Sequence, residues 1–387
     1  MWYFRNPLIV FGDDALEHLR EIKGQRALII TDEVLVKLGF VDMVAKELKH
    51  AGIEHRVFAE VEPDPSAETV TRGAKVALEY QPDWLIGLGG GSPMDAAKMI
   101  WMIYAQPDTE PYAIVPFQDF DARSKARMIC IPTTAGTGSE VTWFMVVTDT
   151  EQQRKIAVGT PEALPDIAIL DSRLVAKMPK GLIADTGMDA LTHCIEGFAS
   201  TWSTDFTSGP AFMAMRLIFK YLKRSFDDDT DKEAREHMLY ASALASMSWS
   251  NGMAGLAHNM GHALGGFFHV THGKSVGLYL PYNLEYLAGA GAGVYADAAR
   301  FIGLEGKLDL DLTHKLIKSV RDLAASLGMP LAVKDLNIDK AAYEKVLPEM
   351  VERAMGEAST PTVLRVPDEK DMEKMFLYAY QGKTIDF

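Results

Sequence analysis

The sequence of 387 residues is poor in cysteine and contains no long apolar run. Its two cysteines, Cys130 and Cys194, lie far apart in apolar surroundings, which argues against a disulfide framework and predicts reduced thiols. No run approaches the ~20 apolar residues that a bilayer span requires. The first residues, MWYFRNPLIVFGDD, lack the apolar core and the cleavage site of a signal peptide. These absences predict a cytoplasmic protein that does not enter a membrane.

Positive charge is also scarce, with 39 Lys and Arg against 53 Asp and Glu and a formal net charge of −14. A chain without a basic face is not expected to bind the phosphates of nucleic acid. The sequence contains no internal repeat and no low-complexity tract. Because 48% of the residues are hydrophobic, the chain can bury large cores. Its length predicts two or three domains.

Residues 1–180 alternate short β-rich runs with helical stretches, the pattern of a mostly parallel sheet covered by helices. We expect helices at about 34–50, 67–80 and 93–104. The candidate strands are LIVF (8–11), RALIIT (26–31), HRVF (55–58), DWLIGLG (83–89), RMICIP (127–132), FMVVTD (144–149) and DIAILD (166–171). The pattern predicts an α/β domain with a Rossmann-like, mostly parallel sheet.

Strand signals stop near MPKGL (178–182), and residues 181–387 are expected to form an all-α domain. The clearest helical segments are ALTHCIEGFAS, GPAFMAMRLIFKYLKR, EHMLYASALASMSWSN and LTHKLIKSVRDLAASLG. A cleft between two such domains is a common place for a cofactor to meet a substrate. We therefore expect the active site in an interdomain cleft.

The stretch DWLIGLGGGSPMDAAK (83–98) predicts a buried strand, a glycine turn and the start of a helix. Ser92 is expected to cap the helix, with Pro93 at its first position and Asp95 completing a capping box. Gly89, Gly90 and Gly91 would let a phosphate approach the free N–H groups at the helix N-terminus. A plain tight turn explains these glycines equally well. The stretch is not the G-x-G-x-x-G fingerprint, so a standard Rossmann site is not indicated.

Two further features fit a nucleotide ligand. Asp32 ends the strand ALIITD, where a carboxylate can bind ribose hydroxyls and repel a 2′-phosphate, favouring NAD over NADP. Taken alone, an Asp after a strand is more often a cap. The loop PTTAGTGSEVT (132–142) is rich in hydroxyls and glycine after a buried strand, and facing a ligand explains this composition better than packing does.

Histidines are concentrated in HNMGHALGGFFHVTH (258–272), which holds four of the ten in the chain. A zincin motif is excluded, because Asn259 stands where the general-base Glu is needed. In TGMDALTHCIEG (186–197), Asp189 and His193 are four residues apart and share one helix face. These two with two of the four histidines would make a site suited to Fe²⁺ or Zn²⁺. Each histidine taken singly is more simply a hydrogen-bonded core residue, but the joint pattern favours the metal.

In these features the chain resembles the iron-containing (group III) alcohol dehydrogenases, from residue 6 to about 286. The matching stretches are NPLIVFG, LIITD, PDPS, GLGGGSPMDAAK, PTTAGTGSEVT, MDALTHCIEG, AHNMGHALGGFFHVTHG and LYLPYNLEY. The resemblance implies the metal ligands Asp189, His193, His258 and His272. It implies that His262 lies beside the metal without binding it and supports a ligand or relays a proton. His269 matches no ligand and is expected to pack among aromatic residues or to contact substrate. Thr271 replaces a frequent Pro, for which we expect a local change only.

The same resemblance implies contacts to the dinucleotide and an oligomeric state. The expected contacts come from the residues Asp32, Gly89, Gly90, Gly91, Ser92, Asp95, Thr133, Thr134, Thr137, Ser139 and Lys155. Asp64 stands where relatives often have Asn, which puts its own contact in doubt. The family usually forms homodimers or larger homo-oligomers, often through the N-terminal strand, here near residues 2–10.

The implied reaction is metal-dependent hydride transfer between a small primary alcohol or diol, or the aldehyde, and NAD. The aromatic residues Trp143, Phe144, Phe267 and Phe268 could line the substrate pocket or could belong to the core. A zinc-dependent glycerol dehydrogenase is the nearest alternative. A metal-free reductase of the maleylacetate type leaves Asp189 and the histidines without a purpose, and intact ligand positions argue against a catalytically dead nucleotide-binding regulator.

Overall fold

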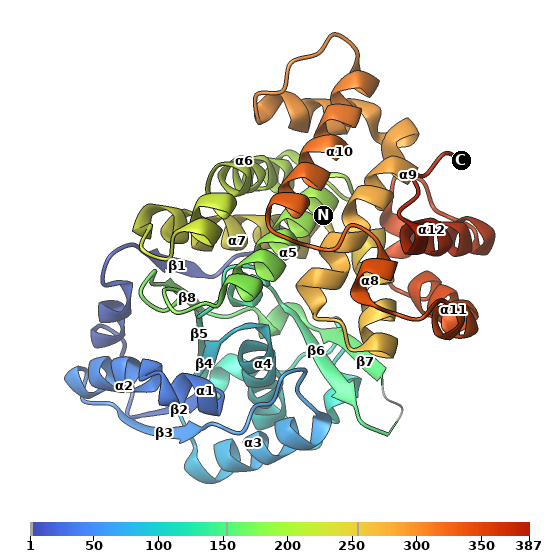
Figure 1. Cartoon of the computed structure of the whole chain (residues 1–387). Helices are drawn as coiled ribbons and strands as arrows, with labels where there is room; N and C mark the ends of the chain where they lie inside the picture. Colours follow the sequence, from blue (N-terminus) through green and yellow to red (C-terminus); the bar gives the residue numbers. More distant parts are fainter. Residues whose placement is uncertain (1–2, 152–153, 254) are drawn as a thin grey trace. The chain divides into compact units, whose positions relative to one another are not determined.

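The computed structural model describes residues 3–151, 154–253 and 255–387 (Figure 1). Contacts between residues divide the described chain into two compact units, Arg5–Met178 and Pro179–Phe387, with Tyr3 and Phe4 grouped with the second unit. The two units are described one after the other. The first is an α/β unit and the second is helical.

The α/β unit is built on a six-stranded parallel sheet with the strand order β1-β8-β5-β4-β2-β3. Its strands are β1 (Leu8–Phe11), β2 (Arg26–Ile30), β3 (Glu54–Phe58), β4 (Trp84–Gly89), β5 (Arg127–Pro132) and β8 (Ile167–Leu170). Its helices are α1 (Glu33–Lys37), α2 (Phe40–His50), α3 (Ala67–Tyr80) and α4 (Gly91–Ala105), with short 3-10 turns at Ala15–Arg20, Pro111–Ala113, Ala122–Ser124, Ser139–Val141 and Pro161–Ala163.

Alternation along the strands distributes the apolar residues between two cores, one on each face of the sheet. Leu28, Ile30 and Leu85 pack with α3 and α4. Ile29 and Ile86 pack with α2 on the opposite face. Because both faces are covered, strands such as β4 consist of buried residues throughout, as expected for a parallel sheet. The predicted α/β fold is confirmed.

Two elements of this unit differ from the sequence predictions. The helix expected at 34–50 is interrupted between α1 and α2 by Gly39, which has a positive φ of 81° that favours glycine. The predicted strand FMVVTD is β6 (Phe144–Asp149), but it does not join the parallel sheet. It pairs antiparallel with β7 (Arg154–Gly159), a strand that was not predicted. The short connection between β6 and β7 favours a hairpin over a crossover.

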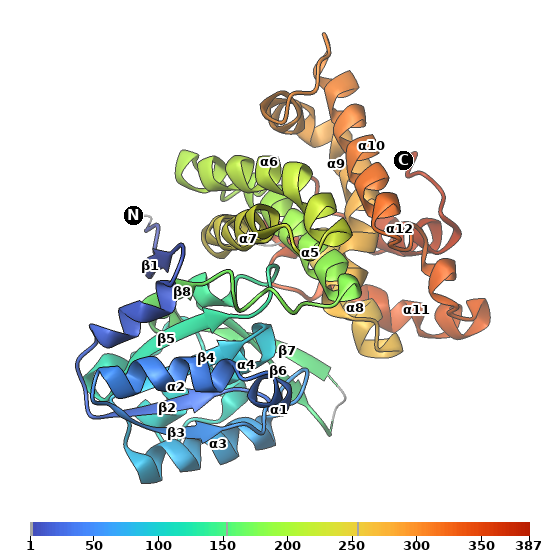
Figure 2. The ribbon, with the colours of Figure 1, turned by 60° about the vertical axis from the view of Figure 1, so that its left-hand side comes forward.

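The helical unit contains eight α-helices in its described residues, in agreement with the predicted all-α region. They are α5 (Lys180–Phe198), α6 (Asp205–Asp227), α7 (Lys232–Gly252), α8 (Leu256–Phe268), α9 (His272–Phe301), α10 (Asp309–Ser326), α11 (Lys340–Met355) and α12 (Glu369–Gln381), with 3-10 turns at Val333–Leu336 and Thr360–Thr362. Helices α6 and α7 lie side by side in both views (Figures 1 and 2). Helix α5 is buried from Ile183 to its end at Phe198, so polar side chains on it have little access to bulk water.

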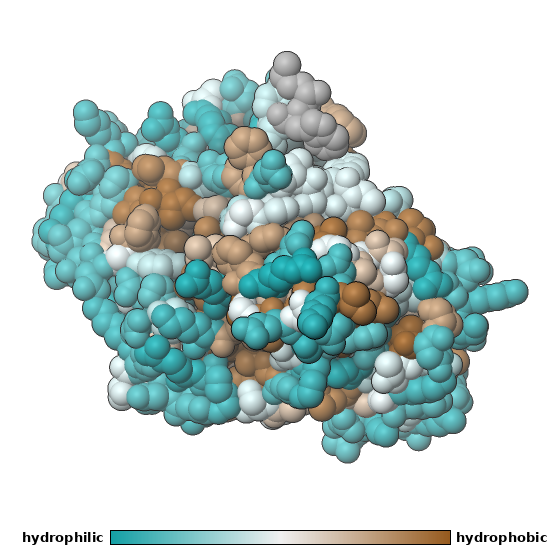
Figure 3. All heavy atoms as spheres, turned by 90° about the horizontal axis from the view of Figure 1, so that it is seen from above, coloured by the Kyte–Doolittle hydropathy of each residue, from teal (hydrophilic) through white to brown (hydrophobic). Residues whose placement is uncertain are grey.

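The surface carries both hydrophilic and apolar side chains. On the face that Figure 3 shows, hydrophilic side chains predominate and apolar side chains form separate areas. The exposed large apolar residues of the helical unit include Trp202, Phe206 and Leu308. Among the described residues, no helix combines the length and the apolarity that crossing a bilayer would require.

Candidate active site

Three helices of the helical unit bring the predicted metal-binding residues together. Asp189 and His193 lie one turn apart on the buried α5. His258 is buried near the start of α8, and His272 is the first residue of α9. The carboxylate of Asp189 is therefore approached by imidazoles from its own helix and from two others.

The distances fit a single divalent ion. Asp189 Oδ1 lies 3.3 Å from His272 Nε2, 3.8 Å from His258 Nε2 and 3.9 Å from His193 Nδ1. Ligand atoms of Asp189, His258 and His272 all lie within 4.8 Å of one another. His193 is outside that mutual set, but its ring stacks on His258 at 4.6 Å between centroids. Ligands at ~2.1 Å from a tetrahedral metal would be about 3.4 Å apart, close to the observed spacing.

Unpaired buried atoms support the same interpretation. Asp189 Oδ1, His193 Nδ1 and His258 Nε2 are buried and have no hydrogen-bond partner among the described residues. Buried polar atoms without partners are costly and rare in folded proteins. A cation placed among these three atoms would supply the missing partner to all of them. The donor set, one carboxylate and three imidazoles, suits Fe²⁺ or Zn²⁺.

The electrostatics keep these side chains in the forms that bind metals. Burial alone would raise the pKa of Asp189, but the neighbouring His193, His272 and His258 outweigh it and hold that pKa well below its usual range. Burial lowers the pKa of His193 to about 4, against the attraction of Asp189, and lowers the pKa of His258 well below its usual value. An ionised carboxylate beside neutral imidazoles is the protonation state that a metal requires.

A second carboxylate, Glu196, orients one of the imidazoles. Glu196 Oε2 lies 2.5 Å from His258 Nδ1, and the backbone N–H groups of Gly255 and Ala257 donate to the same carboxylate at 2.9 and 2.7 Å. Burial raises the pKa of Glu196 to about 7. A carboxylate on one ring nitrogen directs the other nitrogen toward a metal. The sequence prediction missed Glu196, although its spacing of three residues from His193 in THCIEG places both on neighbouring positions of one helix.

Two other histidines of the 258–272 stretch have different surroundings. His262 is half-buried on α8, its Nδ1 lies 3.2 Å from Glu357 Oε1, and its ring lies 5.3 Å from that of His272. His269 is exposed and caps the C-terminus of α8 with a positive φ of 54°. The expected packing of His269 in an aromatic shell is therefore wrong, because the helix ends there and the backbone turns the side chain to the surface.

The loop before α9 is held to α5 by a hydrogen bond from the hydroxyl group of Thr271, which stands where relatives often have proline. Its Oγ1 donates to Asp185 Oδ2 at 2.7 Å, and Asp185 lies one turn before Asp189 on α5. Glycine at position 273 is required there, because a Cβ would lie 2.2 Å from the Asp185 carbonyl oxygen. This hydrogen bond and the close approach at Gly273 tie the start of α9 to α5.

The glycine turn of the α/β unit differs in detail from the predicted cap. Helix α4 begins at Gly91 with Gly90 as its N-cap, and no side chain caps it. The predicted Ser92 cap and Asp95 capping box are therefore wrong. Ser92 Oγ instead accepts a hydrogen bond from Asp64 N at 3.1 Å. Glycine caps leave the first N–H groups of a helix without side-chain partners, which suits an anionic ligand.

Close packing requires glycine at position 89 of this turn and leaves little room at position 91. A Cβ on Gly89, whose φ is +154°, would lie 2.5 Å from Pro93 Cγ. A Cβ on Gly91 would lie 3.1 Å from Thr137 Cγ2, and one on Gly90 would lie 3.4 Å from Thr134 Oγ1. The start of α4 and the hydroxyl-rich loop 132–142 thus face each other directly.

Most of the predicted contact residues in that loop form hydrogen bonds within the protein, and one hydroxyl has no hydrogen-bond partner among the described residues. Thr133 N donates to Gly89 O at 2.9 Å, and Ser139 Oγ donates to Asp95 Oδ1 at 2.5 Å. Thr137 Oγ1 accepts from Ser139 N at 3.3 Å. Thr134 Oγ1 is buried without a partner among the described residues. A hydroxyl that lacks a partner beside a glycine turn is available to a ligand.

Asp32 and Lys155, the two predicted charged contacts, both have protein partners. Asp32 is the N-cap of α1, where its Oδ1 accepts from Leu35 N at 2.9 Å. Lys155 Nζ lies 2.7 Å from Asp64 Oδ1. One oxygen of Asp32 thus caps α1. The positive charge of Lys155 is partly neutralised by Asp64, the residue that stands where relatives often have Asn.

The predicted aromatic residues occur in two separate groups. Trp143 and Phe144 stack at 3.8 Å between ring centroids in the α/β unit. In the helical unit, Phe267 lies under the guanidinium of Arg353 at 4.3 Å, and Phe268 stacks against a tyrosine of α11 at 6.0 Å. All four are partly exposed, so lining a substrate pocket stays a prediction.

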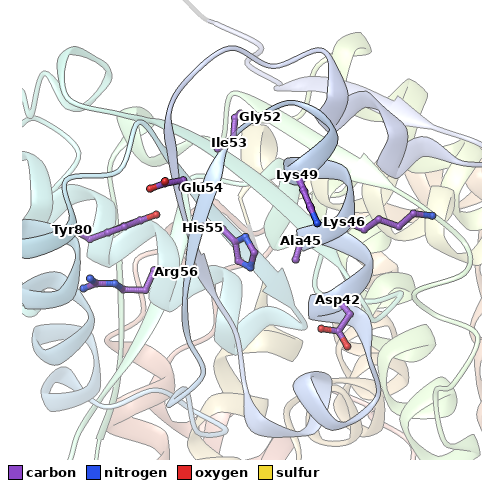
Figure 4. A pocket seen from close by; sticks show the side chains of 10 residues that line it. All are labelled: Asp42, Ala45, Lys46, Lys49, Gly52, Ile53, Glu54, His55, Arg56 and Tyr80. Carbon is purple, nitrogen blue, oxygen red and sulfur yellow. The ribbon is translucent and has the colours of Figure 1, made fainter.

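A hollow elsewhere in the α/β unit lies at the free edge of the sheet, around strand β3 (Figure 4). Figure 4 shows His55 directed toward α2 and Arg56 directed toward Tyr80, over whose ring the guanidinium lies at 4.6 Å. Charged side chains on an edge strand discourage pairing with other chains. The hollow contains neither the glycine turn nor the metal-binding cluster. We therefore assign no part of the enzymatic reaction to it.

Comparison with known proteins identifies the family. The family model described as iron-containing alcohol dehydrogenase matches residues 6–172, and the model of the family's C-terminal part matches residues 183–380. An NADPH-dependent butanol dehydrogenase of Clostridium saccharobutylicum is 39% identical over 98% of both chains. The solved structure of a 1,3-propanediol oxidoreductase is 33% identical, with a TM-score of 0.92, over 98% of this chain and 100% of that one.

Some relatives are larger proteins. A bifunctional aldehyde-alcohol dehydrogenase of Escherichia coli is 35% identical over 98% of this chain, which spans 46% of that relative's length. The predicted fold, family, reaction class and cofactor types are all confirmed by these matches. The protein is an oxidoreductase that interconverts alcohols and aldehydes with a nicotinamide dinucleotide, and it belongs to the iron-containing alcohol dehydrogenase family.

Proposed function

We propose that Asp189, His193, His258 and His272 hold the divalent ion and that the alcohol is oxidised beside them. The observation that carries this proposal is the set of three buried ligand atoms, one carboxylate oxygen and two imidazole nitrogens, that have no hydrogen-bond partner among the described residues. When bound, the ion supplies Lewis acidity that lowers the pKa of the alcohol hydroxyl, and the nicotinamide supplies the hydride acceptor. The protein residues bind and orient these groups and exclude water, since Asp189, His193 and His258 are almost completely buried.

His262 is proposed to move the proton that the alcohol releases. It is half-buried, so it can exchange protons with solvent, and its ring lies beside that of His272. The carboxylate oxygen Oε1 of Glu357 lies 3.2 Å from its Nδ1, where it can accept a hydrogen bond that fixes the ring and leaves Nε2 for the proton transfer. General acid–base catalysis of this kind contributes roughly 10²- to 10⁴-fold to a rate.

For the dinucleotide, we propose that residues 1–180 form the binding domain and residues 181–387 the metal domain. The turn at Gly89, Gly90, Gly91 and Ser92 would receive the pyrophosphate. The remaining proposed contacts are Asp32, Asp95, Thr133, Thr134, Thr137, Ser139 and Lys155. Support comes from the uncapped N-terminus of α4 and from the unpartnered hydroxyl of Thr134 that faces it.

NAD is proposed as the preferred dinucleotide. Asp32 Oδ2 is not needed for the helix cap, so it can accept a hydrogen bond from a ribose hydroxyl and would repel a 2′-phosphate. The nearest lysine on α1, Lys37, is paired with Glu33 at 3.0 Å and would compensate poorly. The relative from Clostridium saccharobutylicum is named for NADPH, so overall similarity does not decide this preference.

The proposed substrates are small primary alcohols or diols and their aldehydes. Relatives named for butanol and for 1,3-propanediol support this size range. A homodimer or larger homo-oligomer is proposed, because β1 lies at the edge of the described sheet and exposes the apolar side chains of Leu8 and Phe11. A cytoplasmic location is proposed because both cysteines are free and buried, as expected for a reducing compartment.

Metal analysis of protein purified without oxygen, combined with a panel of alcohols and both dinucleotides, tests the whole proposal. The decisive variant is His258→Ala, which removes one ligand and leaves the α/β unit untouched. We expect it to lose bound metal and turnover while titration with NADH still shows binding. Full turnover in this variant, or in wild-type protein stripped of metal, would contradict the proposed metal site. Reconstitution with Fe²⁺ and Zn²⁺ in parallel distinguishes the iron enzyme from a zinc-dependent one.

A further inference from the structure

A small cavity lies in the helical unit, between α5, the start of α8 and α9. Its volume is about 20 Å³ for the centre of a water molecule, and all the described residues that line it are buried. Most of its wall is apolar, but Glu196, Ser200, Asn283 and Tyr295 contribute polar side chains. Cavities that stay empty in folded proteins are apolar, so a partly polar wall indicates that a polar molecule occupies the space.

Asn283 brings to this cavity an acceptor atom that lacks a donor. The residue is 3% exposed, and its Nδ2 donates to Tyr279 O at 2.9 Å. Its carbonyl oxygen Oδ1 is buried and has no hydrogen-bond partner among the described residues. Because a buried polar atom without a partner is costly, and because Asn283 lines the cavity, we expect a donor inside the cavity to bind this oxygen.

Glu196, which orients His258, can accept one more hydrogen bond. Its carboxylate accepts from Gly255 N, Ala257 N and the His258 ring, whereas a carboxylate offers about four acceptor positions. The remaining position is on Oε1, which accepts from Ala257 N among the described residues. Gly255 also lines the cavity, and a Cβ on it would lie 2.8 Å from Oε1, so the missing side chain leaves room beside this oxygen.

Tyr295 brings a hydroxyl group to the same cavity. The residue is 1% exposed, and a buried tyrosine hydroxyl usually has a hydrogen-bond partner. Burial raises the pKa of Tyr295, and the negative charge of Glu196 raises it further. Because the interaction between charges weakens with distance, this effect indicates that the hydroxyl lies near the carboxylate. Tyr295 can therefore donate a hydrogen bond to a molecule that also contacts Glu196.

We infer that this cavity is a binding site for one water molecule, which joins Asn283 to Glu196 and thereby supports the metal site. A water needs roughly 10–15 Å³ on the same measure of volume, and a buried one makes about three hydrogen bonds. This water donates to Asn283 Oδ1 and to Glu196 Oε1 and accepts from the Tyr295 hydroxyl. Its role at the metal rests on the proposed function, whereas the water site itself does not.

The water acts on the metal through two hydrogen bonds in series. It holds the carboxylate of Glu196, and Glu196 holds the ring of His258 through Nδ1, which leaves Nε2 directed toward Asp189 and the ion. Residues that hydrogen-bond to a metal ligand fix its orientation, and their replacement weakens metal binding. Because the water is one step further from the metal, its loss should weaken metal binding less than the loss of the Glu196 carboxylate.

The first test is a crystal structure of the wild-type protein, determined with and without Zn²⁺, at a resolution that shows ordered water in the protein interior. We expect one water within hydrogen-bonding distance of both Asn283 Oδ1 and Glu196 Oε1. This measurement needs no substitution, so it stays decisive if a variant does not fold. A cavity without ordered water, or a water that contacts neither oxygen, overturns the inference.

The second test is Asn283→Leu, which removes the unpaired acceptor and places an apolar group at the cavity wall. Its crystal structure should lack the water. Competition for Zn²⁺ with a chelator of known affinity, without alcohol, measures metal binding independently of turnover. We expect binding to weaken roughly 3- to 10-fold, less than for a residue that contacts a ligand directly. Wild-type metal affinity in a folded variant that has lost the water overturns the proposed role of the water.

Tyr282→Phe is the matched control. Tyr282 precedes Asn283 on α9, is also fully buried and donates from its hydroxyl to Leu331 O at 2.5 Å, but it is not among the described residues that line the cavity. The variant should have a lower melting temperature and keep both the water and the metal affinity. An equal loss of metal affinity in this control shows a general effect on α9 and overturns the inference. Failure of the wild-type protein to bind any divalent metal overturns the proposed function instead, and the crystal structure without Zn²⁺ still tests the water site.

Discussion

Replacement of Glu196 by glutamine tests how the metal site is organised, because this residue touches a ligand without being one. Its two carboxylate oxygens accept three hydrogen bonds, from Gly255 N, Ala257 N and the His258 ring at 2.9, 2.7 and 2.5 Å. Glutamine has nearly the same shape but a single acceptor oxygen. At least one of the three donors therefore loses its acceptor, and the bond to the imidazole loses its charge.

The magnitude follows from the type of bond. A hydrogen bond to a charged group contributes about 1.5–3 kcal/mol, and loss of about 2 kcal/mol corresponds to ~30-fold in an equilibrium constant. Replacement of a residue that hydrogen-bonds to a metal ligand typically weakens metal binding 10- to 100-fold. We therefore expect Glu196→Gln to bind Fe²⁺ or Zn²⁺ about 30-fold more weakly. Turnover should fall at limiting metal and recover largely when metal is in excess.

The assay is competition for metal between the metal-free enzyme and a chelator of known affinity, without oxygen. Glu285→Gln is the matched control, because Glu285 also accepts from a backbone N–H, that of Ile385 at 3.0 Å, and from Arg321 at 2.8 Å. It lies on α9, 13 residues or about 20 Å along the helix from His272. A metal affinity in Glu196→Gln equal to that of the control would refute the idea that Glu196 orients His258.

Three further predictions concern other parts of the molecule. His262→Ala should keep its metal, measured by elemental analysis, and lose at least ~100-fold in kcat if this residue moves the proton. Asp32→Gly should lower kcat/KM for NAD and raise it for NADP, measured with one alcohol at fixed ionic strength, and costs the α1 cap only a few tenths of a kcal/mol. Burial raises the pKa of Glu140 from 4.5 to about 7, so the carboxyl group loses its proton more readily in the unfolded chain than in the folded protein. The free energy of unfolding therefore falls as pH rises between these two values. Glu140→Gln should therefore gain stability over wild type, by up to about 3 kcal/mol, between pH 5 and pH 8 in thermal melts.

Each of these predictions has its own contrary result. Loss of metal in step with rate in His262→Ala would make His262 a ligand. An unchanged ratio of NADP to NAD efficiency in Asp32→Gly would leave Asp32 as a helix cap alone. A stability difference for Glu140→Gln that does not depend on pH would show that the carboxyl group stays in one protonation state across that range.

The sequence alone determined the elements whose signals are local. Alternating runs such as DWLIGLG and RMICIP are buried on both sides, which only a covered parallel sheet permits, and these strands lie where they were predicted. The spacing of Asp189 and His193 placed both on one helix face by the 3.6-residue period alone. The ordered set of motifs, rather than any single one, identified the family, because their joint occurrence is far less probable by chance.

Tertiary structure decided what depends on contacts between distant segments. Glu196 is 62 residues from His258, and no periodicity relates two helices so far apart in the chain. Likewise, the β-rich run FMVVTD has a strand's composition, but only its partner β7 decided that it forms a separate hairpin. The buried ammonium of Lys98 looks from sequence like any helix-surface lysine, and only the backbone carbonyls of Thr142 and Phe144, 44 and 46 residues later, account for its burial. Local sequence sets which face of an element is apolar, whereas the partner that covers that face is set by the packing of the whole unit.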